Sequence, residues 1–489
     1  MPSFIRKVKT KSGATAVQIV HKHGREVVRI VHIGSAHNNT ELKILLALAY
    51  EKMHEGQLSF DFPHKNSLKL CLEKSYSGLL WDTLSHVYGS IGFDVITDPV
   101  FRQLVLARIV EPTSKLDTIR VLRGLGLEAP SNSSIHRCLR RVIDNSYRAI
   151  LSQACYRHVA PSSLRLVLYD VTTLYFEVQK DDEYRKPGLS KERRLEPQIM
   201  VGLLVDHKGF PLELQSFEGN RAEVKTILPV LEGFKERHGL GNITVTADAA
   251  MLSAQNISAL EKLGYHYIIG SRLSKTPYKI DEYLAEEGSV LEDGQIFDSC
   301  ITVTVDGKRT KRRVIYQYRR KRAALDLSNI EKTLAKAKSI VEKKADIKRN
   351  RFLKINEKRR EINYALVDKA RRKAGIKGYV TDLDIVPQQV IDSYHQLFEV
   401  EKSFRMSKSD LKARPIYHHK RDSIEAHLTV VFAALAVARH IEEVTGVSIK
   451  KFIRMLEPFR TGVISVNGIT YPVKPRIPDE VVMLISRLK

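Results

Sequence analysis

Residues 164–170 read LRLVLYD, and residues 243–248 read ITVTAD. Each stretch is a run of β-forming residues that stops at an aspartate, Asp170 in the first and Asp248 in the second. Such runs predict buried strands, and we expect each carboxylate at the C-terminal end of its strand, where ligands gather in α/β sheets. An aspartate at that place is also a common turn or cap residue, so the pair needs a third partner before it indicates a function.

The stretches around these two predict the rest of a mixed sheet. In chain order they are QIMVGLLVD at 198–206, FPLELQSFEG at 210–219, a helical pattern at 222–237, a second helical pattern at 252–263 and YHYIIG at 265–270. Three strands followed by alternating helix and strand is the order of an RNase H-like sheet flanked by helices. The predicted fold class is therefore α/β, with the first part of the core at residues 161–275.

A predicted insertion subdomain, residues 276–375, interrupts this alternation. It has strand-like segments, ITVTVD at 301–306 and RRVIYQY at 312–318, and basic clusters, KRTKRR at 308–313 and RRKR at 319–322. A basic helix follows, whose apolar residues have 3-4-3-4 spacing at Leu327, Ile330, Leu334, Ala337 and Val341. So narrow a seam is typical of a coiled coil.

The core is predicted to resume at residues 376–446. Just before it, INYALVD at 362–368 reads as a strand. GYVTDLD at 378–384 leads into a long helix that we expect from Pro387 to Ser409. Residues 447–489 are expected to form a C-terminal tail.

The first 160 residues read as two further regions. Residues 1–38 contain short alternating runs broken by glycines, which predicts a small antiparallel β unit. Residues 39–160 have helical spacing, and SKLDTIRVLRGLG followed by SNSSIHRCLRRVI predicts a helix, a glycine turn and a second helix. A DNA-binding helix-turn-helix of this kind would bring Arg137, Arg140 and Arg141 to phosphates or base edges. An ordinary basic surface helix is the alternative.

The composition favours a polyanionic partner. Lys and Arg number 80 against 56 Asp and Glu, a net charge of +24. Because each phosphate contact releases condensed counterions, this excess favours nucleic acid, with an anionic membrane surface as the alternative. The longest apolar run, Leu428 to Ala438, is shorter than the roughly 20 residues that cross a bilayer, so we expect no membrane association. The four cysteines have no paired spacing, which fits a reducing cytoplasm.

A third acid lies in YHQLFEVEKSFRMSKSDL, residues 394–411. Tyr394 is seven residues before Glu401, and Lys408 is seven residues after it. Seven residues are nearly two helical turns, so on one helix these three side chains share a face with Arg405. That face would hold a metal-binding carboxylate beside two cations and a phenol suited to a phosphate backbone. A charged amphipathic helix with i,i+4 ion pairs is the alternative.

This stretch resembles the DDE transposases of bacterial insertion sequences, in the branch with the signature Y-x2-R-x3-E-x6-K. Tyr394, Glu401 and Lys408 match the spacing, whereas the arginine position holds Leu397, and Arg405 is the substitute on the same face. The resemblance covers roughly residues 160–445. It runs through YDVTTLYFE around Asp170, GLSKERRLEPQ at 188–198, FEGNRAEVKTILPVL at 217–231, TADAAMLSAQNI around Asp248 and RPIYHHKRDSIEAHL at 414–428.

The resemblance implies that Asp170, Asp248 and Glu401 hold two Mg²⁺ ions, for which Mn²⁺ substitutes. Two such ions activate a water or a 3′-hydroxyl for in-line displacement at phosphorus. The implied function is metal-dependent cleavage of double-stranded DNA at the ends of a mobile element, then strand transfer into target DNA. The implied setting is the bacterial cytoplasm, at the nucleoid. A homodimer is implied as well, and the seam at 327–341 is a second reason to expect it.

Two other functions fit the same residues. An inactive, transposase-derived protein would bind specific DNA without metal and without breaking strands. An RNase H-like nuclease would hydrolyse DNA without joining a 3′-hydroxyl end to target DNA. In some relatives a tryptophan of the insertion stabilises a flipped base while the DNA end forms a hairpin. The single tryptophan here is Trp81, and Tyr316 or Tyr318 would have to substitute, so a hairpin intermediate is not predicted.

Overall fold

The computed structural model divides the chain into two compact units, Met1–Lys69 and Leu70–Lys489. The residues it describes are 3–10, 13–24, 26–53, 70–159, 164–177, 181–188, 196–239, 243–251, 253–271, 277–286, 290–305, 308–342, 349–356, 359–466 and 469–489. Most of the segment GLSKERRLEPQ therefore lies outside the described residues.

The first unit is a three-stranded antiparallel sheet with one helix packed on it. Its elements are β1 (Ser3–Lys9), β2 (Thr15–His23), β3 (Glu26–Ala36) and α1 (Asn39–Met53). Val17 and Ile19 of β2 and Ala49 of α1 form its small core. The antiparallel strands predicted within residues 3–33 are confirmed.

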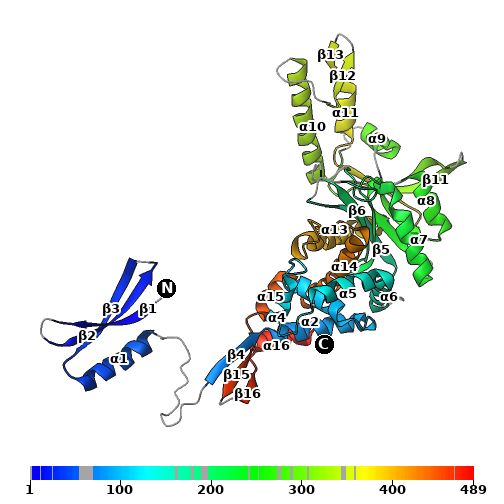
Figure 1. Ribbon diagram of the computed structural model, residues 1–489. Helices are drawn as coiled ribbons and strands as arrows, with labels where there is room; N and C mark the ends of the chain where they lie inside the picture. Colours follow the sequence, from blue (N-terminus) through cyan, green and yellow to red (C-terminus); the bar gives the residue numbers. More distant parts are fainter. Residues whose placement is uncertain are drawn as a thin grey trace. The chain divides into compact units, whose positions relative to one another are not determined.

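The second unit is built on an eight-stranded mixed sheet (Figure 1) in the order β10-β11-β14-β9-β8-β5-β6-β7. The strands are β5 (Leu166–Tyr175), β6 (Gln198–Asp206), β7 (Pro211–Glu218), β8 (Thr244–Ala247), β9 (His266–Ser271), β10 (Ile296–Val305), β11 (Lys308–Tyr318) and β14 (Ile376–Thr381). β5, β6 and β7 are antiparallel neighbours, whereas β8 and β9 run parallel to β5. This arrangement is consistent with the RNase H-like sheet expected from the sequence.

Helices cover both faces of this sheet. They are α7 (Ile227–His238), α8 (Ala254–Lys262), α12 (Pro387–His395), α13 (Phe398–Arg405) and α14 (Arg421–Thr445). Adjacent strand residues point to opposite faces. On β5, Tyr169 faces the residues before α7, while the next residue, Asp170, faces Tyr394 of α12. In Figure 1, α13 and α14 accordingly lie on the other side of the sheet from α7 and α8.

The longest helix, α14, is the centre of the hydrophobic core. Every residue from Ala426 to Arg439 is buried. Among the described residues, α14 is the one helix that is long and apolar enough to span a membrane, but 83% of its most apolar window is buried inside the protein. It is therefore a core helix.

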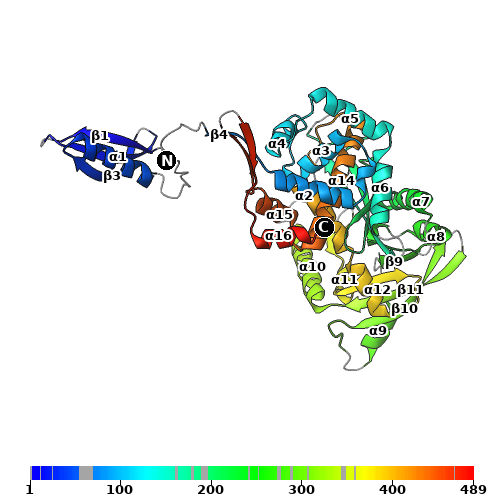
Figure 2. The ribbon, with the colours of Figure 1, turned by 90° about the horizontal axis from the view of Figure 1, so that it is seen from below.

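A group of helices packs on α14, as Figure 2 shows for α3 and α5. The group consists of α2 (Gly78–Ser90), α3 (Pro99–Val110), α4 (Thr118–Gly124), α5 (Asn132–Asp144) and α6 (Tyr147–His158). The predicted pair of helices around a glycine turn is present as α4 and α5, and the Ser131 side chain caps α5 by accepting from Ser134 N.

One strand interrupts the region that was expected to be helical. β4 (Leu70–Tyr76) pairs with β15 (Thr461–Val466), which pairs with β16 (Ile469–Val473). Helices α15 (Ile449–Leu456) and α16 (Asp479–Ser486) complete residues 447–489. The helical expectation was wrong for β4 because its pairing partner lies nearly 400 residues further along the chain, beyond the reach of local periodicity.

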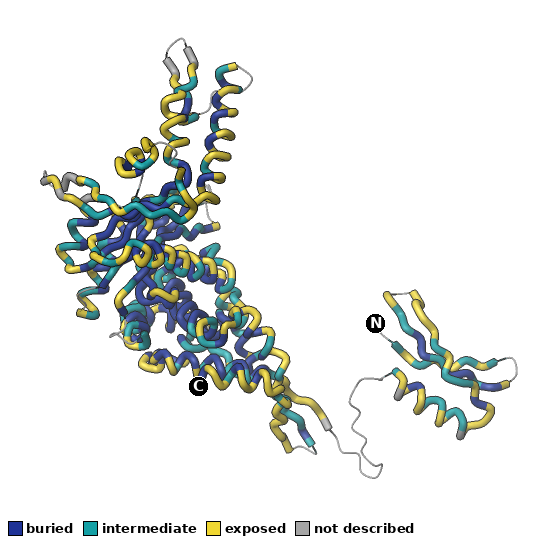
Figure 3. Tube along the Cα trace, turned by 180° about the vertical axis from the view of Figure 1, so that it is seen from behind, coloured by how far each residue is buried: buried dark blue, intermediate teal, exposed yellow. Residues whose placement is uncertain are grey.

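The insertion adds strands to the central sheet and a helical hairpin beyond it. α9 (Tyr278–Ala285) precedes the β10–β11 hairpin, and α10 (Arg320–Val341), β12 (Leu353–Asn356), β13 (Arg359–Ile362) and α11 (Tyr364–Arg372) follow it. Figure 3 shows buried and exposed residues alternating along α10. The seam residues Ile330, Leu334 and Ala337 pack against Phe352 and Val367 of the same chain. The seam therefore gives no support for a dimer.

Two predictions near the third acid were wrong. INYALVD is not a strand, because Asn363 caps a helix by accepting from Leu366 N and α11 starts at the next residue. The helix expected from Pro387 to Ser409 is split into α12, α13 and a π-helical turn, Met406–Asp410. At the split, Leu397 N donates to Tyr394 O at 3.0 Å, a tighter i→i+3 bond than the α-helical ladder uses.

Candidate active site and nucleic-acid interface

Asp170 and Asp248 lie at equivalent positions on adjacent parallel strands. The pairing of β5 with β8 ends at Tyr169 opposite Ala247. Asp170 is the next residue along β5, and Asp248 directly follows β8. Neighbouring strands are about 4.8 Å apart, and the alternation places both carboxylates on the same face. Asp248 follows the end of β8 as predicted. Asp170 does not end its strand, because β5 stays paired with β6 as far as Tyr175.

Tyr394 positions the Asp248 carboxylate. Its hydroxyl donates to Asp248 Oδ1 at 2.9 Å, and the side chain is only 4% exposed. Burial is the main cause that raises the pKa of Tyr394, and the charges of Asp248 and Asp170 add to it. The phenol therefore stays protonated and acts as a donor to Asp248. A Cβ on Gly270 would lie 2.7 Å from this hydroxyl, so the close approach requires glycine there.

The charges of Asp248 and Glu401 both act on Lys377 of β14. Its ammonium lies 4.3 Å from the centre of the Tyr394 ring. Burial and then Arg322 lower the pKa of Lys377, whereas the charges of Asp248 and Glu401 raise it. Glu401 itself is exposed on α13. Tyr394 is thus influenced by Asp170 and Asp248, and Lys377 by Asp248 and Glu401.

These acids do not form a ready-made metal cluster. Across the described part of the chain, no group of three or more His, Cys, Asp or Glu side chains is close enough together to hold a metal ion. The donor chemistry still fits Mg²⁺, because two aspartates at matched positions offer hard oxygen ligands and Mg²⁺ completes its shell with waters and substrate phosphates.

A basic cleft of about 630 Å³ opens beside Asp248 and Tyr394. Its far wall comes from the insertion. The cations that line it are Arg322, Arg351, Lys373 and Lys377. Arg322 belongs to the predicted basic cluster 319–322, whereas Lys377 was not predicted from the sequence. The sequence did contain a signal for Lys377, because it is the one charged residue in the mostly buried strand IKGYVT.

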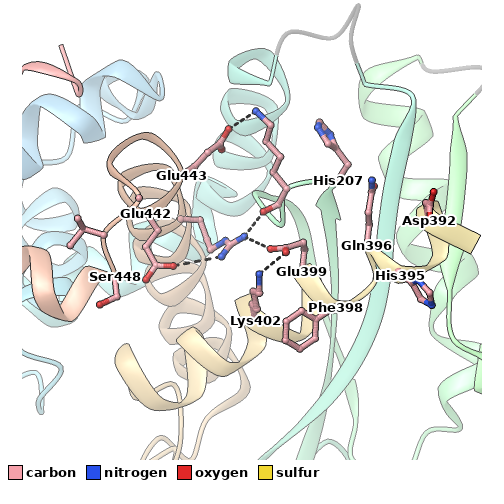
Figure 4. Close-up of a pocket in the computed structure, with 14 residues that line it drawn as sticks. His207, Asp392, His395, Gln396, Phe398, Glu399, Lys402, Glu442, Glu443 and Ser448 are labelled. Atoms are coloured by element: carbon pink, nitrogen blue, oxygen red, sulfur yellow. Dashed lines mark hydrogen bonds and ion pairs between the residues drawn. The ribbon is translucent and has the colours of Figure 1, made fainter. Parts of the chain in front are cut away.

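An ion pair and two hydrogen bonds hold α13, the helix that carries Glu401, on the side away from Lys377. Figure 4 shows this second cleft, between the β6–β7 turn, α13 and the end of α14. Arg439 donates to the Lys208 carbonyl and pairs with Glu399 at 3.1 Å. Ser403 Oγ donates to Gly209 O at 2.6 Å. This clamp holds α13 against the sheet.

The other residues predicted on this face lie on different elements. Leu397, at the place of the signature arginine, is buried at the split between α12 and α13. Arg405 is exposed and lies over the Phe398 ring at 5.8 Å. Lys408 is half-buried in the π-helical turn. The shared helical face expected from seven-residue spacing is therefore broken, although Tyr394 and Glu401 remain close to one site.

The three arginines of the predicted recognition helix differ in their surroundings. Arg137 and Arg140 are exposed on α5. Arg141 donates two hydrogen bonds to Asp98 Oδ2, at 2.8 and 2.6 Å, and Asp98 also caps α3. Arg141 thus has a structural partner that the sequence did not predict. A contact of any of the three with DNA stays a prediction.

Comparison with protein families identifies the chain. A family model described as the transposase DDE domain matches residues 161–437, more than half of the sequence, and the chain belongs to this family. The matched range contains Asp170, Asp248 and Glu401. The protein is thus a DDE transposase by family.

Solved structures with similarity to the chain are also transposases. The piggyBac transposase synaptic complex with hairpin DNA is 11% identical with a TM-score of 0.38, over 84% of this chain and 74% of that one. The Mos1 transposase paired-end complex with the left transposon end is 15% identical with a TM-score of 0.16, over 46% of this chain and 66% of that one. Comparison with curated protein sequences found no match.

Proposed function

We propose that this chain is the transposase of a bacterial insertion sequence, which cleaves double-stranded DNA at the element's ends and transfers the freed strand into target DNA. The observation that carries the proposal is the equivalent position of Asp170 and Asp248 on adjacent strands, with Tyr394 donating to Asp248. The family match and the basic cleft beside Asp248 support it.

Asp170, Asp248 and Glu401 would hold two Mg²⁺ ions, or Mn²⁺ in their place. Bound there, the ions would supply an activated oxygen nucleophile and stabilise the leaving oxygen. Tyr394 keeps the Asp248 carboxylate oriented, as outer partners of metal ligands do. Lys377 balances the charge of Asp248 and Glu401 and provides a cation for the phosphate of the strand that is cut. The clamp on α13 sets how closely Glu401 approaches the two aspartates.

Double-stranded DNA would also contact cations further from the acids. Arg405, Lys408, Arg137 and Arg140 are the proposed contacts, whereas Tyr394 acts through Asp248 and Arg141 is held by Asp98. A homodimer in the DNA complex and a place in the bacterial cytoplasm are proposed from the family resemblance alone. A monomer by light scattering, with and without end DNA, would argue against the dimer.

Cleavage of a plasmid that carries the gene's native flanking DNA tests the proposal. Wild type and Glu401→Ala are compared with Mg²⁺, Mn²⁺ or EDTA. We expect metal-dependent breaks at the element's boundaries that are absent in the variant. Asp392→Asn is the matched control, because this carboxylate lies on α12 in the cleft on the other side and accepts from Gln388. DNA binding without breaks under all three conditions would indicate an inactive, DNA-binding relic.

A further inference from the structure

The candidate active site lies in the unit Leu70–Lys489, and the first unit, Met1–Lys69, contributes no residue to it. In this first unit, α1 covers one face of the sheet β1-β2-β3 (Figure 1). The strand residues in the core under the helix are Ile5, Val17, Ile19, Val31 and Ile33. Because successive residues of a strand point to opposite faces, the residues between these form a second face. Within the described part of this unit α1 is the one helix, so the second face is open.

A polar row crosses the open face. Arg6 of β1 is paired with Gln18 of β2, and Gln18 is paired with His32 of β3. Arg6 Nη2 donates to Gln18 Oε1 at 2.9 Å, and Arg6 and His32 are exposed. This bond uses one of the five guanidinium N–H groups and one lone pair of the amide oxygen. Arg6 and Gln18 therefore form a fixed pair that still has donors and an acceptor for a ligand.

An apolar row lies beside the polar one. Phe4, Val20 and Ile30 are aligned across the three strands. Phe4 is 41% exposed and Ile30 is 47% exposed. The ammonium of Lys22 lies 5.3 Å from the centre of the Phe4 ring, which places this cation on the same face. The open face thus combines hydrogen-bonding groups, cations and apolar contact area.

Charge is distributed unevenly over this unit. Residues 1–36, which contain the three strands, have seven Lys and Arg against one acid, Glu26. Helix α1 is balanced, because it has two acids and two lysines, Glu41, Lys43, Glu51 and Lys52. The basic residues of the unit therefore belong to the sheet, and the sheet is complementary to a polyanion.

We propose that the open face of β1-β2-β3 binds in the major groove of DNA and reads its sequence through Arg6 and Gln18. Arginine pairs with O6 and N7 of guanine, and glutamine with N6 and N7 of adenine, while apolar side chains contact thymine methyl groups. With strands about 4.8 Å apart, the two outer strands are separated by about 10 Å, and the major groove is about 12 Å wide. β-Sheets are among the elements that enter this groove.

The polar row is the feature that favours DNA over an anionic membrane. A membrane surface is bound through cations and inserted apolar side chains, which need no ordered set of donors and acceptors. The inference deepens the proposed function and rests on it for the choice of DNA as the partner. Selection of the DNA sequence would then belong to the first unit, and cleavage to the acids of the second.

Selection from a pool of random duplexes by the full-length chain in EDTA tests the readout of bases. The sequences bound by wild type are compared with those bound by Gln18→Met, Arg6→Met and Lys43→Met. We expect wild type to enrich a motif. Gln18→Met and Arg6→Met should each lose the preference at one base pair, by roughly 5- to 150-fold. Lys43 is the matched control, because it is exposed on α1, the helix that covers the other face, and its variant should enrich the wild-type motif.

The salt dependence of duplex binding separates base contacts from phosphate contacts. Loss of one phosphate contact reduces the slope of log K against log salt by about 0.9. We expect this reduction in Lys22→Met, with the motif unchanged. Gln18→Met should keep the wild-type slope, because it changes no charge. A variant in which the sheet failed to fold would lose the slope as well, so this readout distinguishes a lost base contact from a lost fold.

The wild-type motif in both Gln18→Met and Arg6→Met would overturn the proposal, and so would enrichment of no motif by wild type. An equal loss in Lys43→Met would assign the effect to the unit as a whole and not to its open face. Binding of phosphatidylserine vesicles that Lys22→Met weakens, with DNA selection unchanged in every variant, would identify a membrane-docking face instead.

The result is separable from that of the proposed function, because selection requires no cleavage. A motif that depends on Arg6 and Gln18, in a chain that does not cut the plasmid, would contradict only the proposed function. Plasmid cleavage by a chain whose motif is independent of both residues would contradict only the assignment of the sheet.

Discussion

The hydroxyl of Tyr394 is the contact on which the arrangement of the two aspartates depends most directly. Tyr394→Phe removes the donor to Asp248 Oδ1 and keeps the buried ring. Because loss of an outer partner of a metal ligand typically costs 10- to 100-fold in metal affinity or activity, we expect plasmid cleavage to fall by about that factor. The Mg²⁺ concentration for half-maximal cleavage is expected to rise.

Tyr379→Phe is the control for this prediction, because its ring lies 4.8 Å from that of Tyr394 in the same stack. It should leave the Mg²⁺ dependence unchanged. If Tyr394→Phe cleaved DNA like wild type at low Mg²⁺, Tyr394 would not be a positioning residue for Asp248.

Lys377 is expected to act on DNA and on metal in opposite directions. Lys377→Met removes a cation near Asp248 and Glu401, so divalent ions should bind more tightly. The same change removes a charge from the basic cleft, so DNA should bind more weakly. Cleavage measured against Mg²⁺ and against DNA concentration checks both directions. Lys377→Arg should restore DNA affinity, and a variant in which both affinities fell together would contradict this role.

At the scale of residues, the positions of acids could be predicted better from the sequence than those of cations. Asp170 and Asp248 could be found because each ends a run of β-formers, which places a carboxylate at a sheet position. Lys377 could not be predicted in this way. It lies near Asp248 only because β14 pairs with β9, and about 100 residues of insertion separate these two strands in the sequence. Arg141 was predicted to belong to a basic DNA-binding face. Its ion pair with Asp98, the cap residue of α3, could not be predicted from the sequence of α5 alone.

At the scale of elements, the clamp between the β6–β7 turn and α13 is the feature that sets the position of Glu401. Gly209 has φ of +85°, and a Cβ there would lie 2.9 Å from the Glu399 carbonyl and against the guanidinium of Arg439. Gly209→Ala should therefore destabilise the fold by more than the roughly 1–2 kcal/mol that the left-handed conformation costs alone. Urea unfolding measures the difference.

Gly239→Ala supplies the matched control for the clamp. Gly239 also has positive φ, +64°, but a Cβ there would meet no atom within 4 Å. The excess destabilisation of Gly209→Ala over Gly239→Ala reports the collision with the clamp. Equal losses for the two variants would show that the turn does not press on α13.

Local patterns predicted most elements but not their interruptions. The order of strands β5 to β9 followed from the periodicity of each segment. The split of the helix after Tyr394 could not be predicted from periodicity, because the amphipathic spacing continues through Gln396 and Leu397. In the folded protein, tertiary packing tightens the backbone at these residues. The seam of α10 was visible as a pattern, but its partners Phe352 and Val367 come from the same insertion.

At the scale of the whole molecule, histidines buried in several places make stability depend on pH. Burial is the main cause that lowers the pKa of His238, His418 and His440 to about 4, and it also lowers the pKa of His427 well below its ordinary value. In the unfolded chain these groups titrate near 6.5. The unfolded state thus binds more protons between those values, so stability is present above pH 6.5 and is lost as pH falls toward 4.

Thermal unfolding at pH 7 and pH 5 checks this dependence, and Tm should be lower at pH 5. His238→Phe tests one contribution, because the ring packs at 4.3 Å from that of Tyr156 and 4.6 Å from that of Phe234. This variant should lose less stability between the two pH values than wild type. An equal or larger loss would contradict the assignment to His238.

The central claim is that Asp170 and Asp248, side by side on β5 and β8, form the catalytic centre of a strand-transfer enzyme. Its most direct measurement is the joining of a pre-cleaved 3′-hydroxyl element end to a target plasmid, with Mg²⁺, by wild type, Asp170→Asn and Asp248→Asn. Asparagine keeps the size of each side chain and still accepts the Tyr394 hydrogen bond at position 248. We predict joined product with wild type and none with either variant. Joining by either variant at the wild-type rate would contradict the account.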